Sequence, residues 1–405
     1  MYSDHELFIR PDPTCANFSD ALDQIESSLM TNNRYIVFQC RTTDDCGGWG
    51  DRLAGLAGAA MLAVTTGRRL RIHWPGLEAV VRSNTFYDWT FDYEALGISH
   101  VDMAWVNLNA VHTYSPVGFT NSPVGGEKQD VAFLNTHNHD TYWKNGALLD
   151  EVESRGPRVI FFHGNRGLSH EVLARFEHNH GEFGREFTNG GISATSNTMG
   201  CYRCIWRTLL APSRQAFDIT LSLTSNQTTN ETTLGEILHK LNDPAVCSIG
   251  YAFRIDDSAT SAPLPLNLHG CLMGLVRTMC TASQRKYFMF STNSLVASLE
   301  VSRMLTGTLF DEVFATSEHA LERHVNVKEF SEQYGRDMVE SIVNRATQLA
   351  IADWFMMTAV DVLVVSVSSG FSSSAALYSQ GHQVLVSNTE CDMMHPDALV
   401  AGRFF

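Results

Sequence analysis

The chain has 405 residues, of which 44% are hydrophobic and 18% are charged, so it can bury a large core and form about two domains. This composition excludes an intrinsically disordered protein. The formal net charge of −15 argues against general binding to nucleic acid or to anionic membranes. No stretch reaches the roughly 20 apolar residues that a membrane-spanning helix requires. An anionic ligand would therefore need a local cluster of arginines and backbone N–H groups.

The N-terminal sequence MYSDHELFIRPDPTC has no basic flank followed by an apolar core. We therefore expect no signal peptide, and either a cytosolic protein or one whose anchor is missing from this sequence. Three N-glycosylation sequons, at Asn17, Asn226 and Asn230, are about the number that chance alone produces. They do not by themselves indicate secretion.

The nine cysteines are an odd number, so at least one thiol is expected to stay outside intramolecular disulfides. Cys201 and Cys204 form a lone C-x-x-C motif. A zinc site would need a second pair of cysteines or histidines at fixed spacing, and none follows closely. We therefore expect a local disulfide or buried thiols here rather than a metal.

The first predicted unit spans residues 34–74. The run RYIVF (34–38) is typical of a buried strand, and apolar residues recur at helical spacing from Leu53 onward. Gly67 can end that helix, and RRLRIHW (68–74) follows as a second strand. The pattern predicts a βαβ unit with a glycine-rich loop before its helix.

Residues 75–156 have only weak periodicity, and their elements cannot be ordered from the sequence. PRVIFF (157–162) predicts another buried strand, which is followed by the loop HGNRG (163–167). The polar segment SNQTTNETT (225–233) has no apolar period and is the most linker-like part of the chain.

The second half of the chain alternates between strands and helices. Strands are predicted at 245–253, 286–291, 312–317, 361–367 and 382–387, and helices at 234–241, 294–305, 337–360 and 371–380. Such alternation predicts α/β domains with parallel, doubly wound sheets, whose ligands bind beyond the carboxyl ends of the strands. We therefore expect two Rossmann-like domains, 1–240 and 241–405, that face each other across a cleft.

The first candidate site is the loop GGWGDR (47–52) before the first predicted helix. The free N–H groups and the positive end of a helix can bind phosphate, and Arg52 can add a bidentate contact. The spacing differs from G-x-G-x-x-G, and no Walker lysine follows. A tight turn with a solvent-facing Arg52 is the alternative.

The second candidate site follows the predicted strand in SIGYAFRIDD (248–257). Arg254 lies where the strand should end, and an arginine there can neutralise a leaving pyrophosphate. Asp257 can orient its guanidinium group. The alternative is an ordinary Arg–Asp pair on the surface, which contributes little.

In the third candidate site, Ser368, Ser369 and Gly370 begin a helix directly after a buried strand. Their hydroxyl and backbone N–H groups can bind phosphate at a second helix N-terminus. An ordinary N-cap would explain Ser369 but not the serine run that begins at Ser366.

Several histidines and aromatic residues are weaker candidates. His163, Asn165 and Arg166 follow a predicted strand and can face the cleft, although a tight turn would also explain this loop. Two H-x-H pairs, in 137–140 and 177–182, would need to converge to form a metal site, so surface loops or ligand contacts are favoured. Trp354 and Phe355, on a predicted helix, are expected in the core.

The three motifs, in this order, resemble the fucosyltransferase superfamily with the GT-B fold. The likeness is strongest to the α1,6-fucosyltransferases and the plant cell-wall fucosyltransferases, and weaker to protein O-fucosyltransferases. The family's glycine loop, small-residue helix and following strand compare with GGWGDRLAGL…TTGRRLRIHW, where His73 stands in place of an acid. The family's strand that ends in arginine, with aspartate three residues later, compares with Arg254 and Asp257.

The number of residues between two positions of the third motif adds to the resemblance. In the α1,6 enzymes, an aspartate that reads guanine precedes the second serine of the phosphate loop by sixteen positions. Asp353 and Ser369 reproduce that interval. The resemblance covers about residues 34–74 and 245–387 and is weak between them.

The resemblance implies a GT-B-like α/β fold with two Rossmann-like domains, an N-terminal acceptor side and a C-terminal donor side. It implies inverting transfer of fucose from GDP-fucose to a glycan hydroxyl. The chain has no D-x-D triplet, so we expect no metal and no other cofactor. The expected partners are a nucleotide sugar and a glycan acceptor, with no nucleic acid and no membrane contact unless an anchor is missing.

The expected site residues fall into three groups. They are, as catalytic residues, Arg254, Asp257 and Asp51; as donor-binding residues, Gly48, Trp49, Gly50, Arg52, Asn293, Asp353, Ser368, Ser369 and Gly370; and, as acceptor-side candidates, His163, Asn165 and Arg166.

The sequence also departs from the family. Ala252 stands where the α1,6 enzymes have a histidine that contacts guanine, and Asn293 replaces an acid. The lysine and the glutamate after the arginine, the latter being the proposed base, are Ser258 and Ala262 here. Donor binding is expected to be retained, but the family's base cannot be transferred. If a base assists the acceptor hydroxyl, Asp51 and Asp257 are the candidates.

Three other functions stay open. A transferase with a different nucleotide sugar is favoured by Ala252, and a nucleotide- or glycan-binding protein that has lost catalysis is favoured by the missing base. An NAD-dependent dehydrogenase is disfavoured because the G-x-G-x-x-G fingerprint is absent. The compartment would be the Golgi or secretory lumen for a eukaryotic protein with a missing anchor, and the cytoplasm for a bacterial one.

Overall fold

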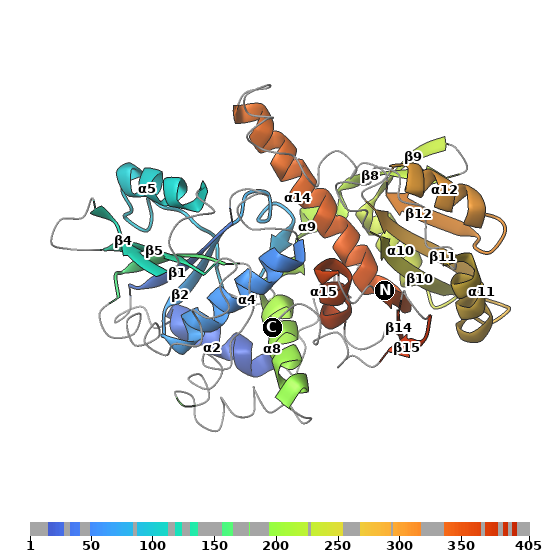
Figure 1. Cartoon of the computed structure of the whole chain (residues 1–405), viewed down its shortest axis with the longest axis horizontal. Coiled ribbons are helices and arrows are strands. Elements are labelled where there is room, and N and C mark those ends of the chain that lie inside the picture. Colours follow the sequence, from blue (N-terminus) through green and yellow to red (C-terminus); the bar gives the residue numbers. More distant parts are fainter. Residues whose placement is uncertain are drawn as a thin grey trace. The chain divides into compact units, whose positions relative to one another are not determined.

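The structure is a computed structural model of the whole chain. It describes residues 15–27, 33–40, 49–83, 87–111, 118–123, 130–136, 156–164, 178, 194–225, 228–253, 268–292, 295–316, 336–365, 369–379, 384–387 and 391–394. These residues form two compact units that divide between Ala211 and Pro212 (Figure 1). Each unit is an α/β domain with its own sheet, as predicted.

The N-terminal unit has a five-stranded sheet in the order β2-β1-β6-β5-β4, in which β4 alone is antiparallel to its neighbour. The strands are β1 (Tyr35–Gln39), β2 (Arg69–His73), β4 (Gly118–Asn121), β5 (Val131–Asn135) and β6 (Val159–His163). The helices are α2 (Ala16–Ser27), α4 (Trp49–Thr65), α5 (His100–Val111) and α8 (Ala194–Leu209). A small second sheet pairs β3 (Val81–Arg82) with β7 (Ala211–Pro212).

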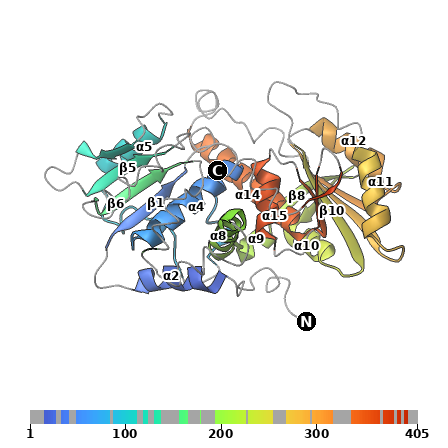
Figure 2. The same cartoon turned by 60° about the horizontal axis from the view of Figure 1, so that its bottom comes forward.

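Helices α4 and α5 cover opposite faces of this sheet (Figure 2). On the α5 face, Met103 and Val106 pack against Val37 and Phe161. On the other face, the α4 residue Gly55 lies next to Phe38. The strands are buried on both faces, which explains why their sequences are continuous apolar runs rather than alternating ones.

The small residues of α4 let this helix approach the chain very closely. A Cβ atom built on Gly55 would lie 1.9 Å from the carbonyl oxygen of Gly164, directly after β6. No side chain can occupy that space unless the backbone moves. Gly55 therefore fixes α4 against the segment that follows β6.

We expect Gly55→Ala to lower the free energy of unfolding by about 3 kcal/mol, because the added methyl group overlaps backbone atoms. Denaturant unfolding of the purified protein measures this loss. Gly274→Ala in helix α11 (Leu268–Met279) of the other unit is the matched control, since a Cβ there meets nothing within 4 Å. That control should gain a few tenths to about 1 kcal/mol from better helix propensity. Equal stability changes in both variants would contradict the packing argument.

Polar contacts cover the edge strand β2. The hydroxyl of Tyr87 accepts a hydrogen bond from the Leu70 amide and donates one to the Leu70 carbonyl oxygen, at 2.5 and 2.7 Å. Burial raises the pKa of this tyrosine. The two guanidinium nitrogens of Arg71 donate to the Glu26 carboxylate of α2, at 2.8 and 3.1 Å. These contacts satisfy the exposed edge of the sheet and hold α2 beside it.

The C-terminal unit has an eight-stranded sheet in the order β15-β14-β13-β10-β11-β12-β8-β9. Its strands are β8 (Thr220–Ser225), β9 (Thr228–Thr233), β10 (Val246–Phe253), β11 (Arg285–Thr292), β12 (Glu312–Thr316), β13 (Val362–Val365), β14 (Val384–Ser387) and β15 (Met393–Met394). The five strands from β14 to β12 are parallel to one another. The sheet is therefore doubly wound, as the alternating pattern predicted.

Helices cover both faces of this sheet (Figure 2). They are α9 (Arg214–Phe217), α10 (Leu234–Leu241), α11 (Leu268–Met279), α12 (Leu295–Leu305), α14 (Arg336–Ala359) and α15 (Gly370–Tyr378). Leu272 of α11 and Val301 of α12 share one core cluster with Ile249 of β10. A Cβ on Gly250, the next residue of β10, would meet Met357 and Val360 on the α14 side.

The segment predicted as a linker forms part of this sheet instead. Strand β8 pairs antiparallel with β12, and β9 pairs antiparallel with β8, so Ser225 and residues 228–233 belong to the sheet and not to a linker. Helix α10 follows directly from a capping box, in which Thr233 and Glu236 exchange hydrogen bonds. The compact units accordingly divide before the predicted boundary at 240/241, because this hairpin and helix belong to the C-terminal unit.

Three disulfides cross-link the described residues. They are Cys15–Cys204, Cys247–Cys280 and Cys271–Cys391, and Cys40 is also disulfide-bonded. Cys201 is buried and keeps its thiol. The C-x-x-C motif therefore does not close on itself, because Cys204 pairs with a cysteine near α2 instead.

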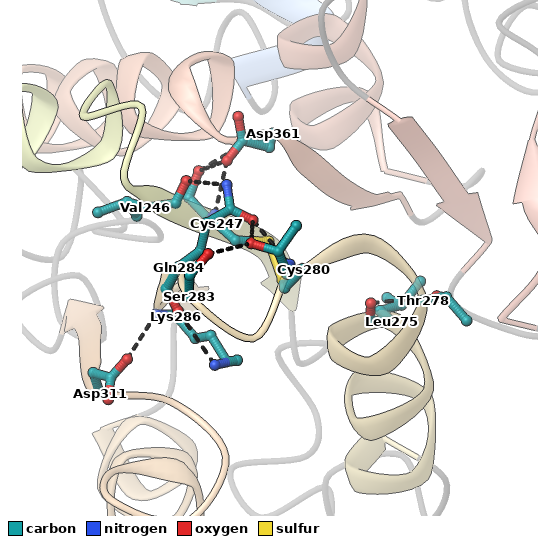
Figure 3. Close-up of a disulfide and its surroundings, with 12 residues drawn as sticks. Val246, Cys247, Leu275, Thr278, Cys280, Ser283, Gln284, Lys286, Asp311 and Asp361 are labelled. Atoms are coloured by element: carbon teal, nitrogen blue, oxygen red, sulfur yellow. Dashed lines mark hydrogen bonds between the residues drawn. A yellow bond between two sulfur atoms is a disulfide. The ribbon is translucent and has the colours of Figure 1, made fainter.

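Figure 3 shows that Cys247–Cys280 lies at the amino ends of the central strands. Nearby, the Asp361 carboxylate accepts hydrogen bonds from the amide and the hydroxyl of Ser248, both at 2.8 Å. The Lys286 amide donates to Asp311 at 2.7 Å. These contacts stabilise the amino ends of the strands. Ligands of such sheets bind at the opposite edge, beyond the carboxyl ends.

Candidate functional site

Two of the predicted motifs follow neighbouring strands in the middle of the C-terminal sheet. Strands β10 and β13 pair directly, and the chain winds away from them in opposite directions along the sheet. Ligands of doubly wound sheets bind at such a switch point, beyond the carboxyl ends. β10 ends at Phe253, one residue before Arg254, and β13 ends at Val365, shortly before the serine run.

Ser369 is the N-cap of helix α15. Its hydroxyl oxygen accepts a hydrogen bond from the Ser372 amide at 3.5 Å, and Gly370 is the first residue of the helix. The N-cap explanation for Ser369 is therefore confirmed. The helix N-terminus still lies next to β13, where its remaining N–H groups can bind an anion.

Asp353 lies on α14 and is fully buried. Its Oδ2 accepts hydrogen bonds from the hydroxyl of Ser291 at 2.5 Å and from that of Thr316 at 3.2 Å. These two residues are register partners at the carboxyl ends of β11 and β12. The aspartate is therefore held at the edge of the sheet where the nucleotide is expected. Trp354, the next residue, is buried in the core, as predicted.

The glycine-rich loop leads into α4 of the N-terminal unit, as predicted, but the helix begins at Trp49. Gly50 lies in its first turn, and Asp51 is partly exposed there. Arg52 is buried rather than solvent-facing, and its guanidinium lies 5.4 Å from the ring centre of Trp74. This stacking excludes the simple solvent-facing alternative for Arg52.

His163, an acceptor-side candidate, is the last residue of β6 and is buried. Its Nδ1 lies 3.3 Å from the backbone oxygen of Gln39, the last residue of β1. The side chain of Gln39 in turn contacts His73, the last residue of β2, with 2.7 Å between Oε1 and Nδ1. From the sequence, Gln39 is not predicted to be a site residue, and His73 is identified only as a replacement for an acid in the first motif of the family.

A sequence signal for these two residues does exist. Gln39 directly follows the apolar run of one predicted strand, and His73 follows Ile72 near the carboxyl end of another. Polar residues at such positions lie at the edge of the sheet where ligands bind. The remaining predicted residues lie outside the described ranges, so their placement is not described: Gly48, Asn165, Arg166, Arg254, Asp257, Asn293 and Ser368.

Each unit thus places polar side chains at the carboxyl edge of its sheet. In the C-terminal unit, this edge offers a carboxylate and a helix N-terminus, which suit a nucleobase and a phosphate. In the N-terminal unit, it offers imidazole and amide groups, which suit hydroxyl groups. Among the described ranges, no group of three or more histidine, cysteine, aspartate or glutamate residues could hold a metal ion.

These two doubly wound units define the class of fold as GT-B-like α/β. Comparison with solved structures shows that the fold is similar to that of a fucosyltransferase. The structure is similar to a mutant of Arabidopsis thaliana FUT1 in complex with GDP, with a TM-score of 0.52 and 12% identity over 95% of this chain and 78% of that chain.

Two structures of the alpha-1,6-fucosyltransferase NodZ are also similar. One was soaked with GDP-fucose and has a TM-score of 0.45 and 16% identity over 89% of this chain and 97% of that chain. The other, from Bradyrhizobium, has a TM-score of 0.44 and 15% identity over 90% and 98% of the two chains. The sequence matches no protein-family model and no curated relative.

Proposed function

We propose that this protein is a metal-independent, inverting glycosyltransferase that moves fucose from GDP-fucose to a glycan hydroxyl. The observation that carries the proposal is the fold shared with FUT1, a protein that was solved with GDP. The order and the intervals of the three sequence motifs support the same activity.

In this proposal the C-terminal unit binds the donor. Asp353 reads the guanine, and the N-terminus of α15, with Ser368, Ser369 and Gly370, holds phosphate. Gly48, Trp49, Gly50, Arg52 and Asn293 complete the donor site. An acceptor oxygen forms a bond to C1 of fucose while the bond between C1 and the phosphate oxygen breaks, and GDP leaves with the electron pair. Arg254 stabilises the negative charge that develops on the leaving diphosphate.

Asp353→Asn is expected to weaken GDP binding by about 10- to 100-fold, because the hydrogen bonds to a charged carboxylate are lost. Inorganic pyrophosphate lacks the base, so its affinity should stay within about twofold of the wild-type value. Calorimetric titration of both ligands measures the two effects. The amide keeps the shape of the side chain between Ser291 and Thr316.

The matched control is Asp311→Asn at the opposite edge of the same sheet, where the exposed carboxylate accepts from the Lys286 amide. This variant should bind GDP like the wild type. Equal losses for GDP and pyrophosphate in Asp353→Asn would remove guanine recognition from the assignment.

The activity itself is tested by incubating the protein with GDP-fucose and a panel of oligosaccharides, in the presence of EDTA. We expect release of GDP that depends on the acceptor, and a fucosylated product whose anomeric configuration is opposite to that of the donor. Retention of configuration, or activity only after a divalent metal is added, would overturn that part of the proposal.

A different nucleotide sugar is the second candidate donor, and one observation favours it. Ala252 stands where the α1,6 enzymes have a guanine-contacting histidine, and it is the register partner of Ser291, beside Asp353. A guanine bound there would lack that contact. Competition among GDP, UDP and ADP distinguishes the two donors.

The disulfides indicate the kind of cellular compartment in which the protein folds. The Cys15–Cys204 and Cys271–Cys391 pairs join cysteines that are 189 and 120 positions apart in the sequence. Such bonds form and persist in oxidising compartments. We therefore place the protein in a secretory lumen such as the Golgi. No helix in the described ranges is long and apolar enough to cross a membrane.

A further inference from the structure

Four neighbouring parallel strands of the N-terminal sheet all end in a polar residue. Strands β2, β1, β6 and β5 end at His73, Gln39, His163 and Asn135, respectively. Gln39 pairs with His73 in register, and Asn135 pairs with His163. These four residues, here called the polar row, run along the carboxyl edge of the sheet, directly after apolar strand residues.

The row is mostly buried. Gln39 is fully buried, and His163 and Asn135 are only 3% and 4% exposed. His73 differs because it is partly exposed, with its ring packed at 4.7 Å from that of Phe91. Burying polar side chains costs free energy unless they are hydrogen-bonded. A row of this kind therefore indicates a functional edge, at which His73 is the member that a ligand can reach.

Gln39 fixes the protonation pattern of His73. In the orientation that the structure gives the Gln39 amide, its Oε1 faces His73 Nδ1 and can only accept a hydrogen bond, so Nδ1 carries the proton. A neutral imidazole carries one ring proton, so its basic lone pair then lies on Nε2. The same argument applies to His163, whose Nδ1 faces the backbone oxygen of Gln39.

We propose that His73 is the general base that activates the acceptor hydroxyl, and that Gln39 positions it. This inference rests on the proposed transferase function and names its missing base. His73 Nε2 takes the proton of the acceptor hydroxyl as that oxygen bonds to C1 of the sugar. The bond from C1 to the diphosphate breaks, and the nucleoside diphosphate leaves with the electron pair. The imidazolium then returns its proton to solvent.

The first test replaces His73 by asparagine, whose amide N–H can still donate to Gln39 while the basic nitrogen is lost. With GDP-fucose as donor and water or the oligosaccharide panel as acceptor, we expect kcat to fall by about 10²- to 10⁴-fold, as for loss of a general base. GDP affinity should be unchanged. His100→Asn is the matched control, since His100 is exposed at the start of α5, and it should keep full activity.

Two further measurements separate catalysis from a structural role. Imidazole added to His73→Ala should restore turnover in a saturable way. Histidine ¹⁵N NMR of the wild type should show the Nδ1–H tautomer for His73, and Gln39→Leu should shift that tautomer and lower kcat.

Each outcome decides the inference. Three results would overturn the role of His73 and leave the transferase assignment in place. They are wild-type turnover by His73→Asn, an inactive His73→Ala that imidazole does not rescue, and an Nε2–H tautomer of His73 in the wild type. If the wild type binds GDP but turns over no GDP-fucose, the proposed function fails, and the role of His73 fails with it.

Discussion

Arg254→Ala is expected to lower the rate of fucosyl transfer by at least about 10²- to 10³-fold, because the charge that stabilises the leaving diphosphate is lost. Strand β10 ends at Phe253, beside the end of β13, so Arg254 directly follows the switch point of the C-terminal sheet in sequence. The loss should appear in kcat, since the diphosphate gains negative charge only as the sugar bond breaks.

The measurement is GDP release from GDP-fucose in the presence of an active acceptor, with the melting curve followed in parallel. Arg277→Ala on α11 is the matched control, because this arginine is exposed and belongs to the same unit. Arg277→Ala should keep wild-type turnover, and both variants should unfold like the wild type. Undiminished turnover by Arg254→Ala would contradict the assigned mechanism.

The largest effect on stability is expected from removing the Cys15–Cys204 disulfide. This bond joins the residue before α2 to helix α8 across 189 positions of sequence, so it strongly restricts the unfolded chain. The double variant Cys15→Ser/Cys204→Ser should lose about 2–5 kcal/mol of unfolding free energy. Denaturant unfolding under oxidising conditions measures the difference.

Cys201→Ala is the control, because it changes a buried cysteine three positions away in the same helix and leaves the cross-link intact. Its loss should stay below about half of that of the double variant. A reductant should reduce the stability of the wild type and leave the double variant less affected. Identical unfolding of the wild type and the double variant would show that this bond does not hold the fold together.

The elements that the sequence predicts well share one property: their own residues carry a clear pattern. The predicted strand 245–253 is observed as Val246–Phe253, and the predicted strand 286–291 as Arg285–Thr292. Both are central and buried on both faces, so their sequences are continuous apolar runs. The predicted small-residue helix is likewise observed as α4, whose Gly55 lies directly against Gly164.

The features that could not be predicted from the sequence depend on residues far away in the chain. Strand β9 (TTNETT) lies at the edge of the sheet and contains no apolar residue, so only its pairing with β8 makes it a strand. The many threonines that gave the segment its linker-like polarity also favour β structure. The partner of Cys204 could not be found either, because spacing does not determine disulfide connectivity.

The candidate site could be predicted in part. The resemblance predicts Asp353 as a site residue. The structure shows that the hydroxyl groups of Ser291 and Thr316 donate hydrogen bonds to its carboxylate. Gln39 and His73 are neighbours only through the pairing of β1 with β2. Gln39 lies in no recognisable motif, and His73 differs from the first motif of the family, which has an acid there. Their contact could therefore not be inferred before the register of the sheet was known.

The central claim is that the C-terminal unit binds a guanine nucleotide without a metal. Calorimetric titration of the purified protein with GDP, UDP and ADP, first without added metal and then with EDTA, tests it most directly. We predict binding of GDP that is at least about tenfold tighter than that of UDP or ADP and that is unchanged by EDTA. No binding, equal affinity for the three nucleotides, or loss of GDP binding in EDTA would contradict the account.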